Sequence, residues 1–389
     1  MKQLHFILIF VILAASCAKI DIDNTSVQDE PIGFAQYTYT NTKAGDSFIK
    51  TGGSLPSGSS FGVFGFFHAQ HSPSVPGLWK DALEPGATVT NHPNLMFNTK
   101  VTYDPTKTEQ YEYNPKRFWP KNQMDRISFF AYYPYDDTHT IVDFHLSQNT
   151  NGLGGYTLEV PADPADHVDF MVSDLCPDQS KALWDASSHT LGLTGLSDGT
   201  VKFTFHHMLA QVRIKDVHTV VENPDVELTV NSISFIGIQV RGTCRPRVEV
   251  DGSGNYSTFL GSVNDRIWPD AEYSKQRADG SKGITLTLPS NGVWDGSADE
   301  NVMLMIPQNL EGCYLEVNYT ISRKSSVHGE GYSYGNNTAR ESLLIPNYSD
   351  WERNKIYNYV INLSPKGIKL DASVAKWIPS DGGIINISD

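Results

Sequence analysis

Ser47, Asp136 and His139 are the residues whose types could support nucleophilic catalysis, as a serine with an acid and a base. A nucleophilic serine of this kind follows an apolar strand and precedes a helix. A polar run over residues 40–43 precedes Ser47 instead, and the surrounding sequence contains no helical pattern. The sequence therefore favours a polar loop at Ser47 over a hydrolase, and we predict no catalytic residues.

Two further clusters have metal-ligand chemistry. His206 and His207 are adjacent in a strand pattern, so their imidazoles point to opposite faces and cannot bind one metal ion together. Hydrogen-bonded histidines are the favoured interpretation. Asp163, Asp166 and Asp169 could bind calcium through carboxylate oxygens, but they lack EF-hand spacing, which favours a solvated acidic loop. We predict neither a metal nor a cofactor.

Aromatic residues between positions 111 and 135 suggest a second class of function. Exposed rings of this kind can stack on sugars, which would make the protein a surface glycan-binding lipoprotein of a polysaccharide-uptake system. Aromatic side chains in β-sandwich proteins are more often part of the core. The residues concerned are Tyr111, Tyr113, Trp119, Tyr132 and Tyr135.

The amino-acid composition limits the kinds of partner that the protein can bind. The 389 residues include 44 Asp and Glu against 30 Lys and Arg, giving a formal net charge of −14. Nucleic-acid binding requires a dense basic surface, so this balance predicts no nucleic-acid partner. Hydrophobic residues make up 39% of the chain and aromatic residues 11%, which is too apolar for disorder. The length favours two domains.

The N-terminus determines the expected compartment. Lys2 precedes a short apolar run, and small residues lead directly into Cys17, as at the lipidation site of bacterial lipoproteins. We predict a signal peptide over residues 1–16, lipidation at Cys17 and a flexible tether over 17–30, with the protein held on the outer membrane by acyl chains. The remaining cysteines are too few and too far apart for a disulfide framework.

The body of the chain has apolar residues with a period of two, which predicts strands with one buried and one solvated face. Dense turn signals separate the strands, and helical periodicity is lacking, so the fold class is all-β. A polar segment with Pro224 marks a boundary between domains at 31–222 and 223–389. Alternating segments are Ile127–Tyr133, Tyr156–Val160, Ile284–Leu288, Cys313–Ile321 and Ile368–Val374.

One strand pattern changes parity. Val201, Phe203 and Phe205 share one face, whereas Ala210 and Val212 continue on the other. A β-bulge near His206-His207 would keep both sets of side chains in one core.

Three stretches in order resemble the fimbrillin family of Bacteroidetes, which includes type V pilins and Mfa-like fimbrial lipoproteins. The first is Arg117-Phe118-Trp119-Pro120 leading into the strand 127–134. The second is Asp169-Phe170-Met171 followed by the strand 201–212. The third is the segment 354–363 running on through Ala375-Lys376-Trp377. The resemblance covers nearly the whole chain after the signal peptide.

This resemblance implies two tandem transthyretin-like β-sandwich domains and a fimbrial subunit or pilus-associated adhesin. It implies partners among other pilus subunits, and surface ligands on host or bacterial cells. Polymerising members lose an N-terminal strand to a protease, and the open groove accepts a strand from another subunit. The corresponding strand here is 32–39, and its candidate pocket fillers are either Ile32 and Phe34 or, on the other face, Ala35, Tyr37 and Tyr39.

The processing site departs from the family's arginine pattern, because the first arginine is Arg117. Lys43 is the best substitute and Lys50 the second; alternatively the chain is never cut and acts as an anchor or accessory subunit. At the other end, a short apolar tail with Ile384, Ile385 and Ile387 could be a donor strand or the last strand of its own domain.

Overall fold

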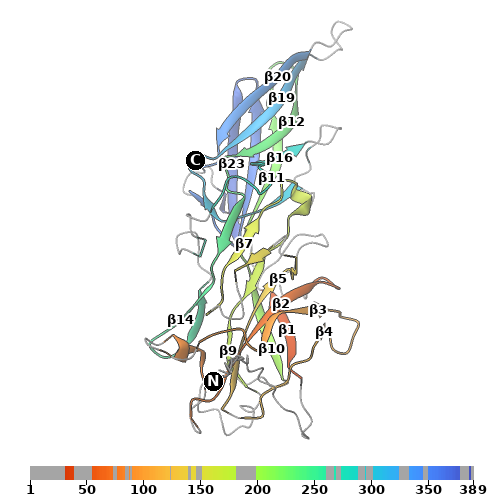
Figure 1. The fold of residues 1–389 in the computed structure, drawn as a ribbon. Helices are drawn as coiled ribbons and strands as arrows, with labels where there is room; N and C mark the ends of the chain where they lie inside the picture. Colours follow the sequence, from red (N-terminus) through yellow and green to blue (C-terminus); the bar gives the residue numbers. More distant parts are fainter. Residues whose placement is uncertain are drawn as a thin grey trace, which may run out of the picture.

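The computed structural model describes an elongated, almost entirely β-sheet molecule (Figure 1). The predicted all-β class is confirmed. Within the described ranges the only helices are 3-10 turns, η1 (Trp79–Ala82) and η2 (Pro164–Asp166), and no helix there has the length and apolar content to span a bilayer. The structure describes residues 31–38, 55–72, 77–83, 87, 90–122, 124–138, 142–145, 151–180, 199–259, 267–268, 273–287, 294, 301–323, 333–344, 349–376 and 385–386.

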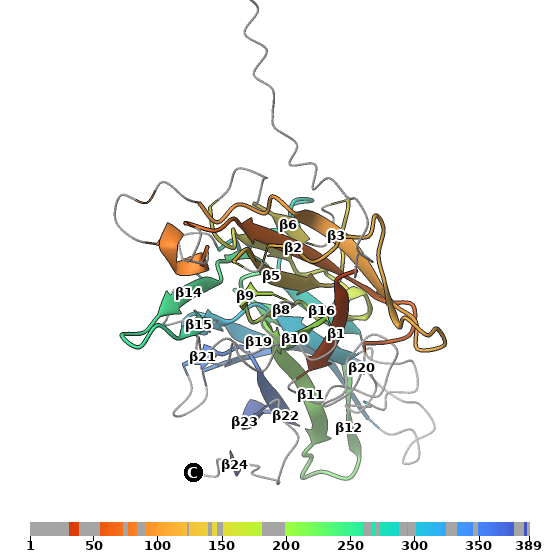
Figure 2. The ribbon, with the colours of Figure 1, turned by 90° about the horizontal axis from the view of Figure 1, so that it is seen from below.

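The N-terminal half is built on an eight-stranded sheet in the order β1-β10-β8-β5-β2-β3-β4, with β9 also paired to β5 (Figure 2). All of its pairings are antiparallel except that of β1 with β10. The strands are β1 (Gly33–Thr38), β2 (Ser60–His68), β3 (Met96–Tyr103), β4 (Tyr111–Glu112), β5 (Arg126–Tyr133), β8 (Met171–Ser173), β9 (Cys176–Gln179) and β10 (Thr200–His207).

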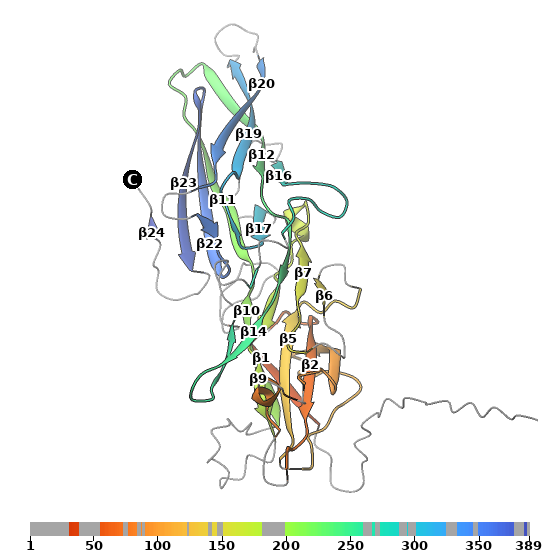
Figure 3. The same cartoon turned by 60° about the vertical axis from the view of Figure 1, so that its left-hand side comes forward.

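The C-terminal half contains two sheets that enclose a core between them (Figure 3). Their orders are β17-β11-β22-β23-β24 and β16-β12-β19-β20. The strands are β11 (Ala210–Thr219), β12 (Val226–Ile236), β16 (Ile284–Thr287), β17 (Val302–Met305), β19 (Tyr314–Arg323), β20 (Ser333–Ser342), β22 (Lys355–Ser364), β23 (Gly367–Lys376) and β24 (Ile385–Asn386).

Three small sheets complete the fold. One of them joins the halves, because a strand from beyond residue 240 pairs with a strand from before residue 160. They are β13-β7-β6, with β6 (Val142–Phe144), β7 (Tyr156–Glu159) and β13 (Arg241–Cys244); the hairpin β14 (Arg247–Val250) with β15 (Tyr256–Phe259); and β18 (Gln308–Asn309) with β21 (Asp350–Trp351).

The alternation of apolar and polar residues correctly predicts the buried face of β19: Leu315, Val317 and Tyr319 are buried, while the residues between them are half-exposed. It predicts β5 less well. All eight residues of β5 are buried, since one face lies on the core around β1 and the other contributes Phe130 and Tyr132 to the larger core. The expectation of one solvated face is therefore wrong for this strand.

The change of parity after Phe205 is a change of sheet and not a bulge. β10 ends at His207 in the N-terminal sheet, and β11 begins at Ala210 in the C-terminal sheet, paired with β17 and β22. The predicted bulge at 206–207 is therefore wrong. A domain division at residue 223 stays a prediction, while the chain itself passes from one sheet to the other at 208–209.

Buried polar contacts fix the junction of the two halves. The Arg277 guanidinium donates to the carbonyl oxygens of Val160, Pro161 and Gly283. His167 accepts from the Leu304 N–H at Nδ1, 2.9 Å away, so its Nε2 carries the proton and donates to the Pro161 carbonyl at 3.0 Å. One hydrophobic core is continuous across the junction, which makes the halves one packed body.

The hairpin β14–β15 reaches from the C-terminal half onto the N-terminal half (Figure 3). The Tyr256 hydroxyl donates to Asp178 Oδ2, and the Trp79 N–H donates to Asp178 Oδ1 at 2.7 Å. The Leu175 N–H donates to the Thr258 hydroxyl at 2.6 Å. Asp178 is 1% exposed, and burial raises its pKa to about 6.

Asp178→Asn is expected to change how stability depends on pH. A carboxyl whose pKa is higher in the folded state than its unfolded value of 3.8 stabilises the fold below that value, and this contribution is lost as the pH rises through about 6. Between pH 4 and 7 the wild-type free energy of unfolding should fall by up to about 3 kcal/mol relative to the variant.

Urea titrations of both proteins across that range measure the difference. Nearby His68 acts in the opposite sense, because burial lowers its pKa to about 4, so only the comparison with the variant isolates Asp178. Asparagine can still accept from Trp79 and tolerates the positive φ of 52° at this position. If the free energy of unfolding changed with pH by the same amount in both proteins, the prediction would be contradicted.

Candidate functional site

β1 lies at the edge of the N-terminal sheet and runs parallel to β10 (Figure 2). The register pairs Gly33 with Thr200 and continues without a shift to Thr38 opposite Phe205. The Gly33 N–H donates to the Gly199 carbonyl at 3.0 Å. Strands 167 residues apart in the sequence are thus brought side by side by six consecutive pairs.

The side chains of Ile32 and Phe34 enter the core beneath β1. Ile32 is 1% exposed and Phe34 4% exposed. The Phe34 ring lies 5.1 Å from that of Tyr113, 5.9 Å from that of Phe129 and 5.8 Å from that of Phe203, measured between centroids. Both side chains therefore lie in the core, while their role as pocket fillers of a removable strand stays a prediction. Ala35 is half-buried, and of Tyr37 only the backbone is described, in β1.

A loop over residues 113–119, here called the clamp loop, holds the start of β1. The Ile32 N–H donates to the Arg117 carbonyl at 2.8 Å, and the Tyr113 hydroxyl donates to the Ile32 carbonyl at 2.9 Å. Pro31 forms an isolated antiparallel bridge with Phe118. Burial raises the pKa of Tyr113, which keeps its hydroxyl protonated as a donor. The sequence drew attention to Tyr113 and to residues 117–119 for other reasons, but it did not predict their contacts with β1, because these join segments about 80 residues apart.

The sheet curls so that its two edges, β1 and β4, approach each other around a common core. Ile32 and Phe34 therefore close the core on the side where the sheet would otherwise be open. An extended segment that left this seat would expose the Phe129 and Phe203 rings and the unpaired backbone edge of β10. β1 is therefore an edge strand whose two buried apolar side chains complete the core of the N-terminal half.

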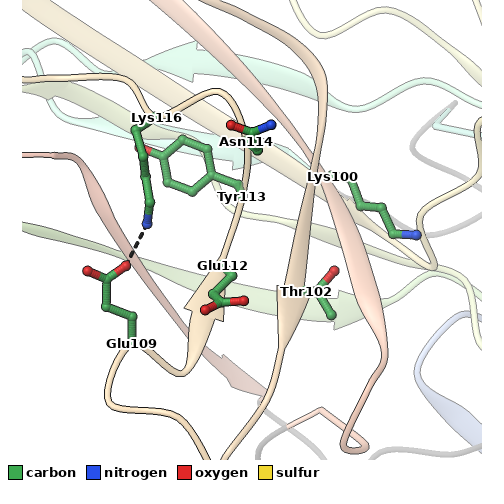
Figure 4. Close-up of a pocket in the computed structure, with 7 residues that line it drawn as sticks. All are labelled: Lys100, Thr102, Glu109, Glu112, Tyr113, Asn114 and Lys116. Carbon is green, nitrogen blue, oxygen red and sulfur yellow. Dashed lines mark hydrogen bonds and ion pairs between the residues drawn. The ribbon is translucent and has the colours of Figure 1, made fainter.

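The aromatic residues that suggested a sugar platform are mostly in the core. Tyr113, Trp119 and Tyr132 are 6%, 7% and 0% exposed, so they present no stacking face, and the glycan-site interpretation is not supported. A polar hollow of about 400 Å³ adjoins Tyr113, and both of its carboxylates are paired with lysines: Glu109 with Lys116 at 2.6 Å (Figure 4), and Glu112 with Lys107, which lies outside the lining. Its lining residues are Lys100, Thr102, Glu109, Glu112, Tyr113, Asn114 and Lys116.

The adjacent histidines each contact an aspartate, as hydrogen-bonded strand histidines would. His206 Nε2 lies 2.9 Å from Asp174 Oδ2 near the surface, and His207 Nδ1 lies 2.8 Å from Asp169 Oδ1 in full burial. Asp169 is therefore not part of a solvated loop, contrary to expectation. Asp163 instead caps η2 by accepting from the Ala165 N–H at 2.9 Å.

Asp136, the candidate acid partner of Ser47, has a structural role instead, since its carboxylate accepts from the Thr138 and Val142 N–H groups.

The structure describes part of the C-terminal tail. Ile385 lies in β24, paired with Val374 at the edge of the C-terminal sheet. The remaining candidates lie outside the described residues: Cys17, Tyr39, Lys43, Lys50, Ser47, His139, Ile384 and Ile387.

The sheet order, the seated edge strand and the shared core define an all-β protein of packed sheets in which an N-terminal segment completes the edge of one sheet. The family model described as Fimbrillin-like matches residues 78–377, and the chain belongs to this family. A fimbrial protein from Bacteroides vulgatus is similar in fold, with 20% identity over 88% of this chain and 99% of the other, and a TM-score of 0.54.

A second similar structure is the tip fimbrial protein Mfa3 from Porphyromonas gingivalis with a C-terminal truncation. It shares 10% identity over 88% of this chain and 99% of the other, with a TM-score of 0.34. Comparison with curated protein sequences gave no match.

Proposed function

We propose that the protein is a non-enzymatic fimbrial subunit or pilus-associated adhesin that assembles with other subunits by strand exchange. A cut after Lys43 or Lys50 separates β1 from the rest of the chain. β1 then leaves its seat, and an extended strand from another subunit takes its place. Before assembly the subunit is held on the outer membrane through a lipid at Cys17.

The observation that carries this proposal is the seating of β1. Among its described side chains, Ile32 and Phe34 anchor it in the core, together with six backbone pairs and the clamp loop. Once a cut removes its covalent connection to β2, release is no longer opposed by the effective concentration of a tethered segment. The seat left behind combines a free strand edge with alternate pockets, which is the geometry of strand addition.

Limited proteolysis tests the proposal. The mature chain, starting at Cys17 without its lipid, is incubated with a trypsin-like protease, and mass spectrometry and light scattering follow the cut and the oligomer size. We expect loss of the segment up to residue 43 or 50 and growth of oligomers. The variant with both Lys43→Ala and Lys50→Ala should stay intact at these sites and monomeric. A correctly cut protein that remains monomeric with β1 still bound would overturn strand exchange.

A further inference from the structure

The first residues of β1 are hydrogen-bonded along both of their edges, whereas the rest of the strand is paired along one edge. On the β10 side, the Gly33 N–H donates to the Gly199 carbonyl at 3.0 Å. On the opposite side, the Ile32 N–H donates to the Arg117 carbonyl of the clamp loop at 2.8 Å. From Phe34 to Thr38, the described pairs involve β10 alone. β1 is therefore an interior strand at its start and an edge strand at its end.

The side-chain contacts of β1 are concentrated at the same end. A Cβ atom added at Gly33 would lie 2.9 Å from Thr200 Oγ1, closer than real Cβ contacts come, so β1 and β10 lie unusually close here. Ile32 and Phe34, on either side of this glycine, are 1% and 4% exposed. The described contacts therefore hold the start of β1 more firmly than its end.

Tyr113 joins the clamp loop to the strand. Its hydroxyl donates to the Ile32 carbonyl at 2.9 Å and accepts from the Arg117 N–H at 3.1 Å, so that one hydroxyl connects both segments. Its ring lies 5.1 Å from that of Phe34, measured between centroids. Loss of the hydroxyl would take a donor away from the Ile32 carbonyl without emptying the space that the ring fills.

The clamp loop is also fastened to the N-terminal half by contacts that do not involve β1. Trp119 is 7% exposed, and its ring lies 6.0 Å from that of Phe129. Its indole N–H donates to the Gly199 carbonyl at 3.2 Å, the same oxygen that accepts from the Gly33 N–H. The loop can therefore keep its place while the end of β1 moves.

The order of residues along the chain gives these contacts a consequence. The predicted lipidation site, Cys17, precedes β1, and the proposed cutting sites, Lys43 and Lys50, follow it. A cut at either lysine leaves the lipid and β1 on one fragment and all later strands on the other, here called the body. After the cut, the body is attached to the lipid only through the contacts that seat β1.

We propose that the clamp loop is a latch that retains β1 after the cut, so that cutting the chain and opening the seat are separate steps. Until the latch opens, the seated β1 is the non-covalent attachment of the body to the membrane. β1 detaches from Thr38 toward Ile32, because the end next to the cut is paired along one edge and the latched end along two. This inference rests on the proposed cut and lipid anchor, and it adds the step that determines when the subunit leaves the membrane.

The first experiment measures the retention of β1 without depending on the natural cutting sites. A recognition sequence for a specific protease is inserted directly after Lys43 in the mature chain without its lipid, and native mass spectrometry follows the fragment that carries β1. In the wild type we expect the cut to be complete while the fragment is still bound. Tyr113→Phe keeps the ring beside Phe34 but removes the hydroxyl, so the fragment should dissociate about tenfold faster.

Tyr103→Phe is the matched control. Tyr103 is 6% exposed in the same core, packs against Tyr111 and makes no described hydrogen bond with β1, so loss of its hydroxyl should leave the dissociation rate unchanged. Circular dichroism of the uncut proteins checks that each variant is folded. Dissociation of the wild-type fragment as fast as the cut itself, or equal rates for Tyr113→Phe and the wild type, would overturn the latch.

The second experiment places the lipidated chain, with the same inserted site, in outer-membrane vesicles. After the cut, the body should stay in the vesicle pellet and leave it at the rate at which the fragment dissociates, about tenfold sooner for Tyr113→Phe. Body that leaves the pellet as soon as it is cut would overturn the attachment through β1. Uncut protein that does not pellet with the vesicles would overturn the lipid anchor, and with it the membrane step.

The fate of the released body separates this inference from the proposed function. Body that has lost β1 and still forms no oligomers would overturn strand exchange while leaving the latch intact. Oligomers that grow at the rate of the cut, without the delay set by dissociation of β1, would overturn the latch while leaving strand exchange intact.

Discussion

Replacing Phe34 with alanine is expected to lower the free energy of unfolding of the N-terminal half by about 3–5 kcal/mol. The Phe34 ring is 4% exposed and packs against the rings of Tyr113, Phe129 and Phe203, none of which can move far to refill the space. The loss also weakens the seating of β1, so cleavage near Lys43 should become faster. Urea denaturation and the rate of limited proteolysis measure the two effects.

Phe118→Ala is the matched control for this prediction. Phe118 belongs to the clamp loop beside β1 but is 38% exposed, so the same substitution should cost no more than about 1 kcal/mol. Equal losses for the two variants would show that β1 is not anchored through Phe34.

Asp169→Ala is expected to be the second strongly destabilising change, lowering the free energy of unfolding by about 3–5 kcal/mol. Asp169 Oδ1 lies 2.8 Å from His207 Nδ1, and both side chains are fully buried. Removing the carboxylate takes this contact away from a fully buried imidazole, and the loss of a hydrogen bond by a buried polar group is costly. His207 is also the last residue of β10, so the strand that supports β1 is weakened.

The adjacent pair provides the control. His206 Nε2 lies 2.9 Å from Asp174 Oδ2, but their side chains are 21% and 43% exposed, so Asp174→Ala should cost about 0–1 kcal/mol. Thermal or urea unfolding of the two alanine variants makes the comparison directly. A loss for Asp174→Ala as large as that for Asp169→Ala would contradict the role assigned to burial.

Local patterns predicted the strands because alternation is a property of neighbouring residues. The buried positions 315, 317 and 319 follow from it, whereas for strand 32–39 it left two faces open, of which the structure buries Ile32 and Phe34. The pattern cannot say which sheet a strand joins. Phe205 and Ala210 are separated by only five positions, yet they lie in different sheets, because each sheet is completed by strands far away in the sequence.

The same limit applies to the candidate site. Gly33 between two apolar residues is a visible signal for a close approach of two backbones, but Thr200, which makes the approach close, is identifiable only in three dimensions. Tyr113 and Trp119 stand in a polar stretch that resembles an exposed surface. They are buried because β1 and β10, distant in sequence, pack over them.

The pairing of β13 with β7 has a mechanical consequence. These strands lie at the waist of the elongated molecule, and a pull between its two ends acts along their length (Figure 1). Hydrogen bonds that are loaded along the strands must break together, whereas bonds that are loaded across the strands break one after another. In the proposed fibre, tension would pass through this waist and through the seat of β1, the proposed junction between subunits, and the weaker of the two would set the force at which the fibre breaks.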